Sequence, residues 1–356
     1  MSRPPKGVAP GIPDGTTGLT PAWLGEALHC GGLDGVQVSE VEIFDLPAER
    51  EARSRYATLR PKYARRPSQA PASLFVKLTD RWPADGLLGD QYGRELRFYE
   101  EVAPRLRVRV PRLYYGAASP DGRCGVILLE DLTGARREDS LRGLTPRDLA
   151  RATDVLASLH AQWWERRELA SWRFLFALPP DAAFFRRRLD ESLDAVVAKG
   201  ALGDHARDVL AALSGRFEAV MARLRARPQT LVHFDFRPEN LFFGVDGDAD
   251  RIAAFDWGMV GRGPGAYDLA NLAIRATRPR SRDEALSAFT RWVEGLRERG
   301  VHAARDALLA DYRVAVLLFL FEYVLLVAPA REWEYARAML RLGAEHAELV
   351  GAGDVL

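Results

Sequence analysis

The sequence has few cysteines and almost no net charge. Its 356 residues include only Cys30 and Cys124, which lie far apart and match no metal-binding spacing, so neither a disulfide framework nor a cysteine metal site is expected. The 50 basic side chains nearly balance the 49 acidic ones, so no overall field would attract nucleic acid or a membrane surface. We therefore expect a cytoplasmic protein with no nucleic-acid and no membrane partner.

Long apolar runs are also missing. The strongest candidate, from Val314 to Ala328, is shorter than the roughly 20 apolar residues that a bilayer requires, and it contains Glu322. This run predicts a buried core helix. Residues 1–19 open with the Pro- and Gly-rich stretch MSRPPKGVAPGIPDG, which lacks the apolar segment of a secretory signal, and we expect them to form a flexible lead-in.

The length and the pattern of apolar residues predict two lobes of different structure. Short apolar stretches from Val36 to about Leu132, separated by turn residues, predict a small antiparallel sheet, interrupted by one helix near Tyr92 to Val102. From Thr145 onward the apolar residues recur with helical spacing almost to the end. The expected fold class is α+β, with a sheet lobe over residues 20–132 and a mainly helical lobe over residues 133–356.

A polar hairpin interrupts the helical half. Asp235 and Asn240 precede its first strand, LFFG, and Asp256 ends its second strand, RIAAFDW, so a short turn would bring the three side chains together. Carboxylate and amide oxygens suit Mg²⁺, which binds few protein ligands together with substrate phosphates. If Asn240 and Asp256 hold the metal, Asp235 is left to accept a proton, as phosphoryl transfer requires.

Two motifs in this hairpin resemble those of eukaryotic-like kinases. His233-Phe-Asp-Phe-Arg-Pro-Glu-Asn240 fits H-x-D-x-x-x-x-N, and Asp256-Trp-Gly stands where that superfamily has D-F-G. The chain is most similar to the aminoglycoside phosphotransferase and choline kinase group. Within that group, the tract AFDWGMVGRGPGAYDLANL and the helix LASLHAQWW look closest to the ecdysteroid-kinase-like branch. The resemblance covers roughly residues 36–330 and implies a bilobal protein-kinase-like fold that uses ATP and Mg²⁺.

The resemblance implies a role for each residue of the hairpin motifs. Asp235 would be the catalytic base, Asn240 and Asp256 the metal ligands, and His233 a brace for the catalytic loop. Arg237 stands where protein kinases commonly have a lysine that touches the transferring phosphoryl group, and its forked guanidinium could replace that lysine.

The resemblance also implies nucleotide contacts in the sheet lobe. Lys77, in the strand SLFVKL, resembles the lysine that grips the α and β phosphates, and Glu95 resembles its ion-pair partner, although Glu100 and Glu101 lie on the same expected helix. The stretch LLEDL looks like the hinge between the lobes. There the backbone groups of Glu130 and Leu132 would pair with adenine.

Three other features allow more than one interpretation. Asp268, in YDLA, either ties its helix to the catalytic loop or caps that helix. His160, on the apolar side of its helix, is expected to be a structural histidine rather than a metal ligand. The basic stretch RSRYATLRPKYARRP resembles an RNA surface in composition, but the balanced net charge favours a solvated strand face and loop.

One region departs from the superfamily pattern. No glycine occurs between Val36 and Phe75, where the superfamily has a glycine-rich phosphate loop, and glycine lets backbone amides approach a phosphate closely. This leaves a looser loop, phosphate contacts from Arg53 or Arg55, or weak nucleotide binding.

These features together predict an ATP-dependent phosphotransferase acting on a hydroxyl group of a small organic acceptor. A kinase acting on Ser or Thr of a peptide in modified-peptide biosynthesis is an alternative, but the tract after Asp256 lacks an A-P-E type activation segment. A nucleotide-binding pseudokinase scaffold is a third hypothesis, which the missing glycines suggest.

Overall fold

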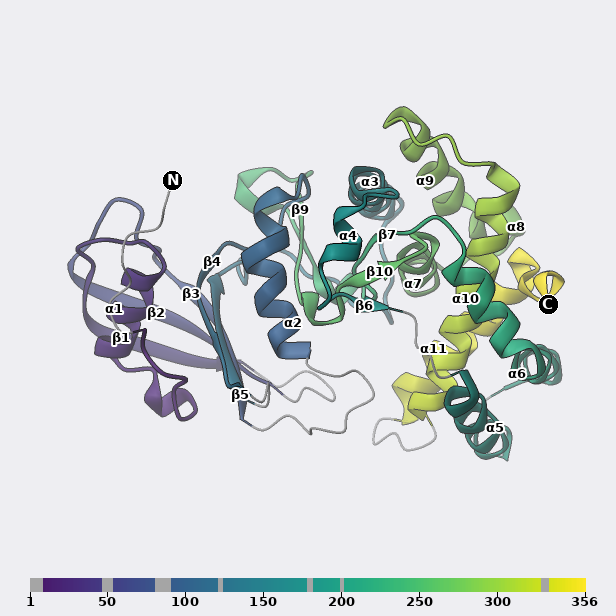
Figure 1. Cartoon of the computed structure of the whole chain (residues 1–356), viewed down its shortest axis with the longest axis horizontal. Coiled ribbons are helices and arrows are strands. Elements are labelled where there is room, and N and C mark those ends of the chain that lie inside the picture. The colour runs from purple at the N-terminus through teal and green to yellow at the C-terminus, as the bar shows by residue number, and fades with distance from the viewer. Residues whose placement is uncertain are drawn as a thin grey trace. The chain divides into compact units, whose positions relative to one another are not determined.

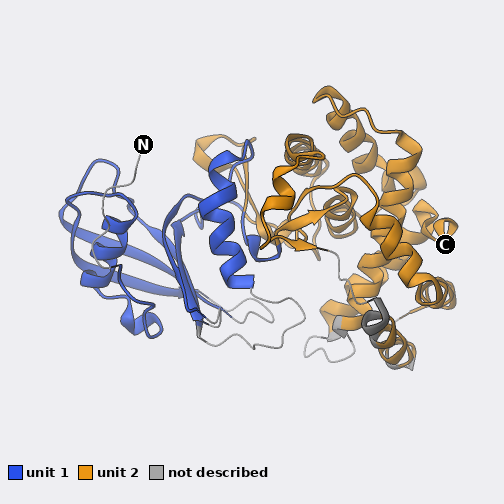
Figure 2. Ribbon diagram, viewed as in Figure 1, with its two compact units in different colours: residues 1–136, 255–259 blue, residues 137–254, 260–356 orange. Residues whose placement is uncertain are grey.

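The computed structural model of the chain contains two compact units (Figure 2). The first comprises residues 1–136 and 255–259, and the second comprises residues 137–254 and 260–356. The assignment of nucleotide binding to one lobe and acceptor binding to the other stays a prediction. The structure describes residues 9–46, 54–80, 91–120, 124–177, 182–198, 202–327 and 333–356.

The first unit is built on a five-stranded antiparallel sheet (Figure 1), which confirms the sheet predicted from the short apolar stretches. The strand order is β1-β2-β3-β5-β4. Residues 55–65 of the basic stretch form β2, and residues 60–65 of this strand are mostly exposed, as expected of a solvated strand face. The strands are β1 (Gln37–Leu46), β2 (Arg55–Arg65), β3 (Leu74–Asp80), β4 (Leu113–Ala118) and β5 (Cys124–Glu130).

Helices pack on both faces of this sheet. Helix α1 (Pro21–Cys30) begins where the Thr20 hydroxyl accepts a hydrogen bond from the backbone N–H of Trp23, 3.2 Å away, with proline at the first helical position. Its apolar side joins the core formed by alternate residues of β3, including Val76. Because side chains alternate along a strand, Lys77 faces the opposite side, where α2 (Gln91–Arg97) lies.

Part of the expected lead-in is anchored to the first unit. The Tyr115 hydroxyl donates a hydrogen bond to the carbonyl of Pro10, and the Trp23 indole donates to the carbonyl of Gly11 over 2.8 Å. Residues 10 and 11 are therefore held against α1 and the sheet. The first eight residues of the lead-in lie outside the described residues.

The second unit is mainly helical. Helix α3 (Pro146–Trp163) is capped by Thr145, whose hydroxyl accepts a hydrogen bond from the backbone N–H of Asp148. Proline occupies its first position, which is typical of a helix start. The other helices are α4 (Glu168–Ser171), α5 (Ala182–Ala198), α6 (Asp204–Arg225), α7 (Ala266–Ala276), α8 (Arg282–Ala285), α9 (Ser287–Glu298), α10 (Arg305–Val327) and α11 (Trp333–Val350).

Two small sheets lie within the helical unit. The predicted polar hairpin pairs β8 (Leu241–Phe243) with β9 (Ile252–Ala254) in antiparallel register. A three-stranded sheet has the order β6-β10-β7, in which β10 (Gly261–Gly263) pairs with β6 (Phe176–Ala177) and with β7 (Thr230–Val232). The predicted catalytic segment, residues 233–240, runs from the end of β7 to the start of β8.

Residues 314–327 of the most apolar stretch lie inside α10, as predicted, and Ala328 lies outside the described residues. Side chains such as Val316, Leu317 and Leu320 are fully buried, so this helix forms the core of the second unit. Among the described residues, no helix is both long enough and apolar enough to cross a membrane.

Candidate active site

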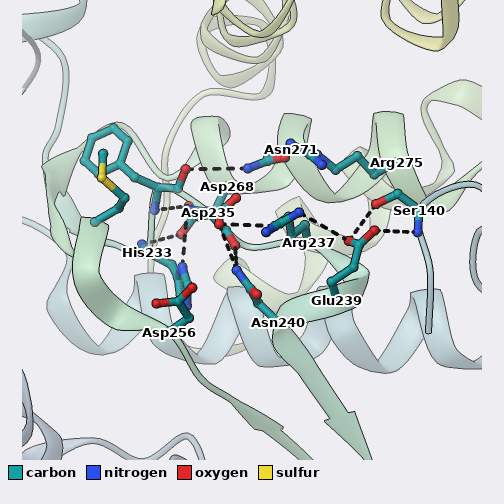
Figure 3. Close-up of polar contacts among 12 residues, drawn as sticks. Ser140, His233, Asp235, Arg237, Glu239, Asn240, Asp256, Asp268, Asn271 and Arg275 are labelled. Carbon is teal, nitrogen blue, oxygen red and sulfur yellow. Dashed lines mark hydrogen bonds and ion pairs between the residues drawn. The ribbon is translucent and has the colours of Figure 1, made fainter. Parts of the chain in front are cut away.

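The segment from His233 to Asn240 folds around the carboxylate of Asp235 (Figure 3). Asp235 Oδ2 accepts hydrogen bonds from Arg237 Nε over 3.1 Å and from Asn240 Nδ2 over 2.9 Å. The backbone N–H of Asp235 donates to His233 Nδ1 over 3.2 Å, so His233 braces the loop from inside. The structure thus brings together four of the predicted site residues within the second unit.

Asp268 holds the backbone that leads into Asp235. Its Oδ2 accepts from the backbone N–H of His233 and its Oδ1 from that of Phe234, each over 2.8 Å. Helix α7 is preceded by Gly265, so Asp268 lies inside the helix and is not its N-cap. Of the two interpretations of Asp268, the tie to the catalytic loop is the one that the structure shows.

This tie secures a strained backbone conformation at Phe234. Its φ of 63° lies in the left-handed region, where a bulky residue costs roughly 1–3 kcal/mol. Its ring packs against Tyr267 with centroids 4.9 Å apart and against Phe176 at 5.1 Å. Asn271 Nδ2 donates to the Phe234 carbonyl over 3.5 Å. Side-chain packing and hydrogen bonds therefore fix the turn that presents Asp235.

Asn240 has a buried oxygen that suits a metal ligand. The residue is fully buried, and its Nδ2 donates to both the backbone carbonyl and the Oδ2 of Asp235, each over 2.9 Å. A flipped amide would place oxygen against two oxygens, so these contacts fix its orientation. Asn240 Oδ1 has no hydrogen-bond partner among the described residues. A buried acceptor without a donor is costly, and a hard cation would satisfy it.

Arg237 is held between two carboxylates. Its Nε lies 3.1 Å from Asp235 Oδ2, and its Nη1 lies 4.0 Å from Glu239 Oε2. Burial lowers the pKa of Arg237, but the charges of Asp235 and Glu239 outweigh burial and raise it well above its ordinary value. The guanidinium is therefore a fixed positive charge beside the predicted base.

Ser140 orients Glu239, and no sequence pattern predicts this contact. Its Oε1 accepts from the backbone N–H of Ser140 over 2.8 Å and its Oε2 from the Ser140 hydroxyl over 2.7 Å. Burial raises the pKa of Glu239, but the charge of Arg237 and the hydrogen bonds from Ser140 outweigh burial and lower this pKa below its ordinary value. The two residues are 99 positions apart and belong to common types, so only the fold reveals the contact.

A second cluster lies in the first unit around Lys77. Its Nζ is 2.7 Å from Glu95 Oε2 and 2.8 Å from Asp256 Oδ1, and its side chain is only 10% exposed. Burial alone would lower the pKa of Lys77, but the carboxylates of Asp256 and Glu95 raise it well above its ordinary value. Lys77 is therefore charged and does not point to solvent.

Glu95 is the glutamate of its helix that meets Lys77. Its side chain is 1% exposed, whereas Glu101 pairs on the surface with Arg97 over 3.0 Å and Glu100 is exposed. The helix predicted near Tyr92 to Val102 consists of α2 followed by a π-helical turn at Phe98–Val102. The contact with Lys77 is present, and the role of both residues in nucleotide binding stays a prediction.

Helix α2 and the turn that follows it fix the segment containing Asp256. The Trp257 ring stacks on Phe98 with centroids 4.2 Å apart, and Arg94 Nη1 donates to the carbonyl of Gly258 over 2.8 Å. Asp256 itself has a φ of 63°, a left-handed conformation that aspartate tolerates better than most residues. The strained turn presents its carboxylate to Lys77.

The hinge residues lie where β5 ends. The backbone N–H of Glu130 donates to the carbonyl of Arg112 over 2.8 Å, so only the carbonyl of Glu130 could pair with adenine. The Glu130 carboxylate accepts from Arg109 Nη2 over 2.6 Å. Leu132 is buried, and its carbonyl accepts from the backbone N–H of Ala135.

Arg53 and Arg55 are the two residues of the glycine-free region that were proposed to contact phosphate. Arg55 begins β2, and Arg53 lies outside the described residues. The convergence of Asp256 with Asp235 and Asn240 on one ion likewise stays a prediction, because the two clusters belong to different compact units.

Comparison with known proteins identifies the family. The model of the phosphotransferase enzyme family (APH) matches residues 51–317, three quarters of the chain. Comparison with curated proteins gave no match.

Several solved structures share the fold. A choline kinase from Cryptosporidium parvum is 10% identical, with a TM-score of 0.54 over 89% of this chain and 91% of that chain. An amicoumacin kinase in complex with AMP-PNP and Ca²⁺ is 16% identical, with a TM-score of 0.54 over 86% of this chain and 88% of that chain. An ADP-bound aminoglycoside phosphotransferase is 16% identical, with a TM-score of 0.50 over 90% and 97% of the two chains.

These matches confirm the bilobal kinase-like α+β fold and the resemblance to aminoglycoside phosphotransferases and choline kinases, while the ecdysteroid-kinase-like branch stays a prediction. With a family match over most of its length and a kinase-like site, the chain belongs to the phosphotransferase enzyme family and is a kinase with an alcohol group as acceptor.

Proposed function

We propose that the protein transfers the γ-phosphoryl group of ATP to a hydroxyl group of a small organic acceptor, with Asp235 as the base. The observation that carries this proposal is the arrangement around Asp235. Both of its side-chain hydrogen bonds go to Oδ2, and Oδ1 has no partner among the described residues. Oδ1 is thus left to accept the proton of an attacking hydroxyl.

In this reaction the bond between the γ-phosphorus and the ADP oxygen breaks and a bond to the acceptor oxygen forms. Asp235 takes the hydroxyl proton, and ADP leaves. Arg237, fixed beside Asp235, supplies positive charge where the transferring group becomes more negative. Lys77, held by Glu95, would bind the α and β phosphates, and the Glu130 carbonyl and the Leu132 N–H would pair with adenine.

Asn240 and Asp256 would hold Mg²⁺. The buried, unpartnered Oδ1 of Asn240 fits this role, and carboxylate and amide oxygens are the ligands that Mg²⁺ prefers. When bound, the ion would neutralise charge on the phosphates.

A small acceptor is favoured over a peptide. Helix α7 begins at Ala266, so only residues 257–265 separate it from Asp256. Part of this short connection forms β10, which is paired on both sides. The described chain therefore has no extended activation segment here on which a peptide could lie.

The test is transfer of label from [γ-³²P]ATP to a library of hydroxylated metabolites. The Asp235→Asn variant should lose roughly 10²- to 10⁴-fold in kcat, because the base is replaced by a group of the same size that cannot take a proton. Its KM for ATP should change little. Asp204→Asn, an exposed aspartate at the start of α6, is the matched control and should behave as wild type. Equal incorporation by Asp235→Asn and wild type would reject Asp235 as the base.

A further inference from the structure

A buried chain of hydrogen bonds runs from α9 to the catalytic segment. Trp292 Nε1 donates to His160 Nδ1 over 3.0 Å, and His160 Nε2 lies 3.3 Å from Asp268 Oδ2. All three side chains are fully buried. The chain ends at the carboxylate that holds the backbone N–H groups of His233 and Phe234.

The chemistry of the groups fixes the direction of every hydrogen bond. An indole N–H only donates, so His160 Nδ1 must accept and the ring proton must be on Nε2. Nε2 then donates to Asp268. Among the described residues, all three groups that hydrogen-bond to the Asp268 carboxylate are therefore donors.

Close packing leaves these side chains little freedom. A Cβ at Gly265 would lie 2.6 Å from His160 Nδ1, and a Cβ at Gly295, on α9, would lie 2.8 Å from the Cβ of Ala157, on α3. Larger residues at either position would push the helices or the imidazole away. The Thr230 hydroxyl donates to the His160 carbonyl over 2.8 Å and ties α3 to β7.

We propose that Trp292 and His160 are positioning residues that hold Asp268, and through it the backbone of residues 233 and 234, in the conformation that aims Asp235. This inference rests on the proposed function, since the orientation of Asp235 affects the reaction only if Asp235 is the base. The left-handed turn at Phe234 directly precedes the base, so rotation of the Asp268 carboxylate would release two backbone N–H groups and displace Asp235. Displacement of a catalytic group by about 1 Å can cost 100-fold in rate.

The first variant is Trp292→Phe, which removes the indole N–H and keeps a buried aromatic ring. With ATP hydrolysis as the probe reaction and water as acceptor, we expect kcat to fall roughly 10- to 100-fold while KM for ATP stays within about two-fold. Tyr312→Phe is the matched control. It also removes a fully buried aromatic hydrogen-bonding group that contacts a histidine, His346, but it has no hydrogen bond to Asp268.

The second pair of variants tests His160. His160→Leu removes both hydrogen bonds, whereas the amide of His160→Gln can accept from Trp292 and donate to Asp268. We expect a loss of kcat with leucine and partial recovery with glutamine. A role in stability alone would not produce this difference at unchanged KM.

Amide hydrogen exchange at residues 233 and 234 provides a measurement that does not depend on turnover. Exchange should be faster in Trp292→Phe and His160→Leu than in wild type and Tyr312→Phe. It tests the positioning role even if the proposed function fails. The proposal is overturned if Trp292→Phe matches wild type in both kcat and exchange, or if Tyr312→Phe changes them as much.

Discussion

A single buried cation, Lys77, holds two carboxylates together in the first unit. Lys62, on the neighbouring strand of the same sheet, also meets two carboxylates, Glu40 at 2.7 Å and Glu42 at 3.4 Å, but its side chain is 57% exposed. Distances alone would make the two lysines equivalent. They should contribute differently to stability because their exposure differs: removing one partner of a buried ion pair leaves an uncompensated buried charge, which is costly.

This contrast gives a stability prediction. Lys77→Met should lower the free energy of unfolding by about 3–5 kcal/mol, because Glu95 is left buried without its partner. Lys62→Met, the matched exposed control, should change it far less. Urea unfolding measures both. Adding Glu95→Gln to Lys77→Met should recover part of the loss, and the account of this cluster is wrong if the two single lysine variants prove equally stable.

At the same scale, the residues that carry a motif were predictable and their supports were not. The spacing of polar residues in the hairpin indicated Asp235 and Asn240, and the resemblance to kinases indicated Lys77, because each of these residues belongs to a short local motif. The pairing of Glu239 with Ser140 and of His160 with Trp292 joins positions 99 and 132 residues apart. No local pattern records such contacts, which depend on how helices pack.

At the scale of elements, the helix starts were readable from capping chemistry. Thr20-Pro21 and Thr145-Pro146 begin α1 and α3, because a hydroxyl cap and a proline satisfy the first turn. The π-helical turn after α2 was not foreseen, since its sequence still has helical spacing. There the ring of Phe98 stacks on Trp257, a tertiary contact.

The packing of α10 against α11 predicts a pH dependence of stability. The Tyr312 hydroxyl and His346 Nε2 lie 2.7 Å apart in the buried interface, and burial lowers the pKa of His346 from 6.5 to about 4. A lowered folded-state pKa means that the folded state favours neutral histidine. The resulting stability is complete above pH 6.5 and is lost as pH falls toward 4.

Between pH 6.5 and pH 4 the free energy of unfolding of wild type should fall by about 3 kcal/mol because of His346, since each pKa unit is worth about 1.4 kcal/mol. His346→Gln keeps an acceptor for Tyr312 but does not titrate, so its stability should fall less between pH 7 and pH 4. Urea unfolding at both pH values is the measurement. The control is His29→Gln, which alters an exposed histidine, and its free energy of unfolding should fall as much as that of wild type. An equal fall in the free energy of unfolding of His346→Gln would contradict the assignment to His346.

At the scale of the whole molecule, each compact unit holds one part of the proposed site. The first unit contains Lys77, Glu95 and Asp256, and the second contains Asp235 and Asn240. The sequence placed Asp235 and Asn240 in the helical lobe, in agreement with the second unit, and Lys77 and Glu95 in the sheet lobe. It also placed Asp256 in the helical lobe, but residues 255–259 belong to the first unit, where Asp256 pairs with Lys77 and Trp257 stacks on Phe98. The acceptor was not predictable, because no local motif in the sequence records which side chains the packing of helices brings together.

The central claim is that Asn240 and Asp256 hold a divalent ion that binds the phosphates of the nucleotide. Calorimetric titration with AMP-PNP, in Mg²⁺ and in EDTA, tests it most directly, with Asp256→Asn beside wild type. The account predicts binding at least about ten-fold tighter with Mg²⁺ in wild type, and a much smaller difference in the variant. Equal affinity with and without Mg²⁺ in wild type, or an unchanged metal dependence in Asp256→Asn, would contradict it.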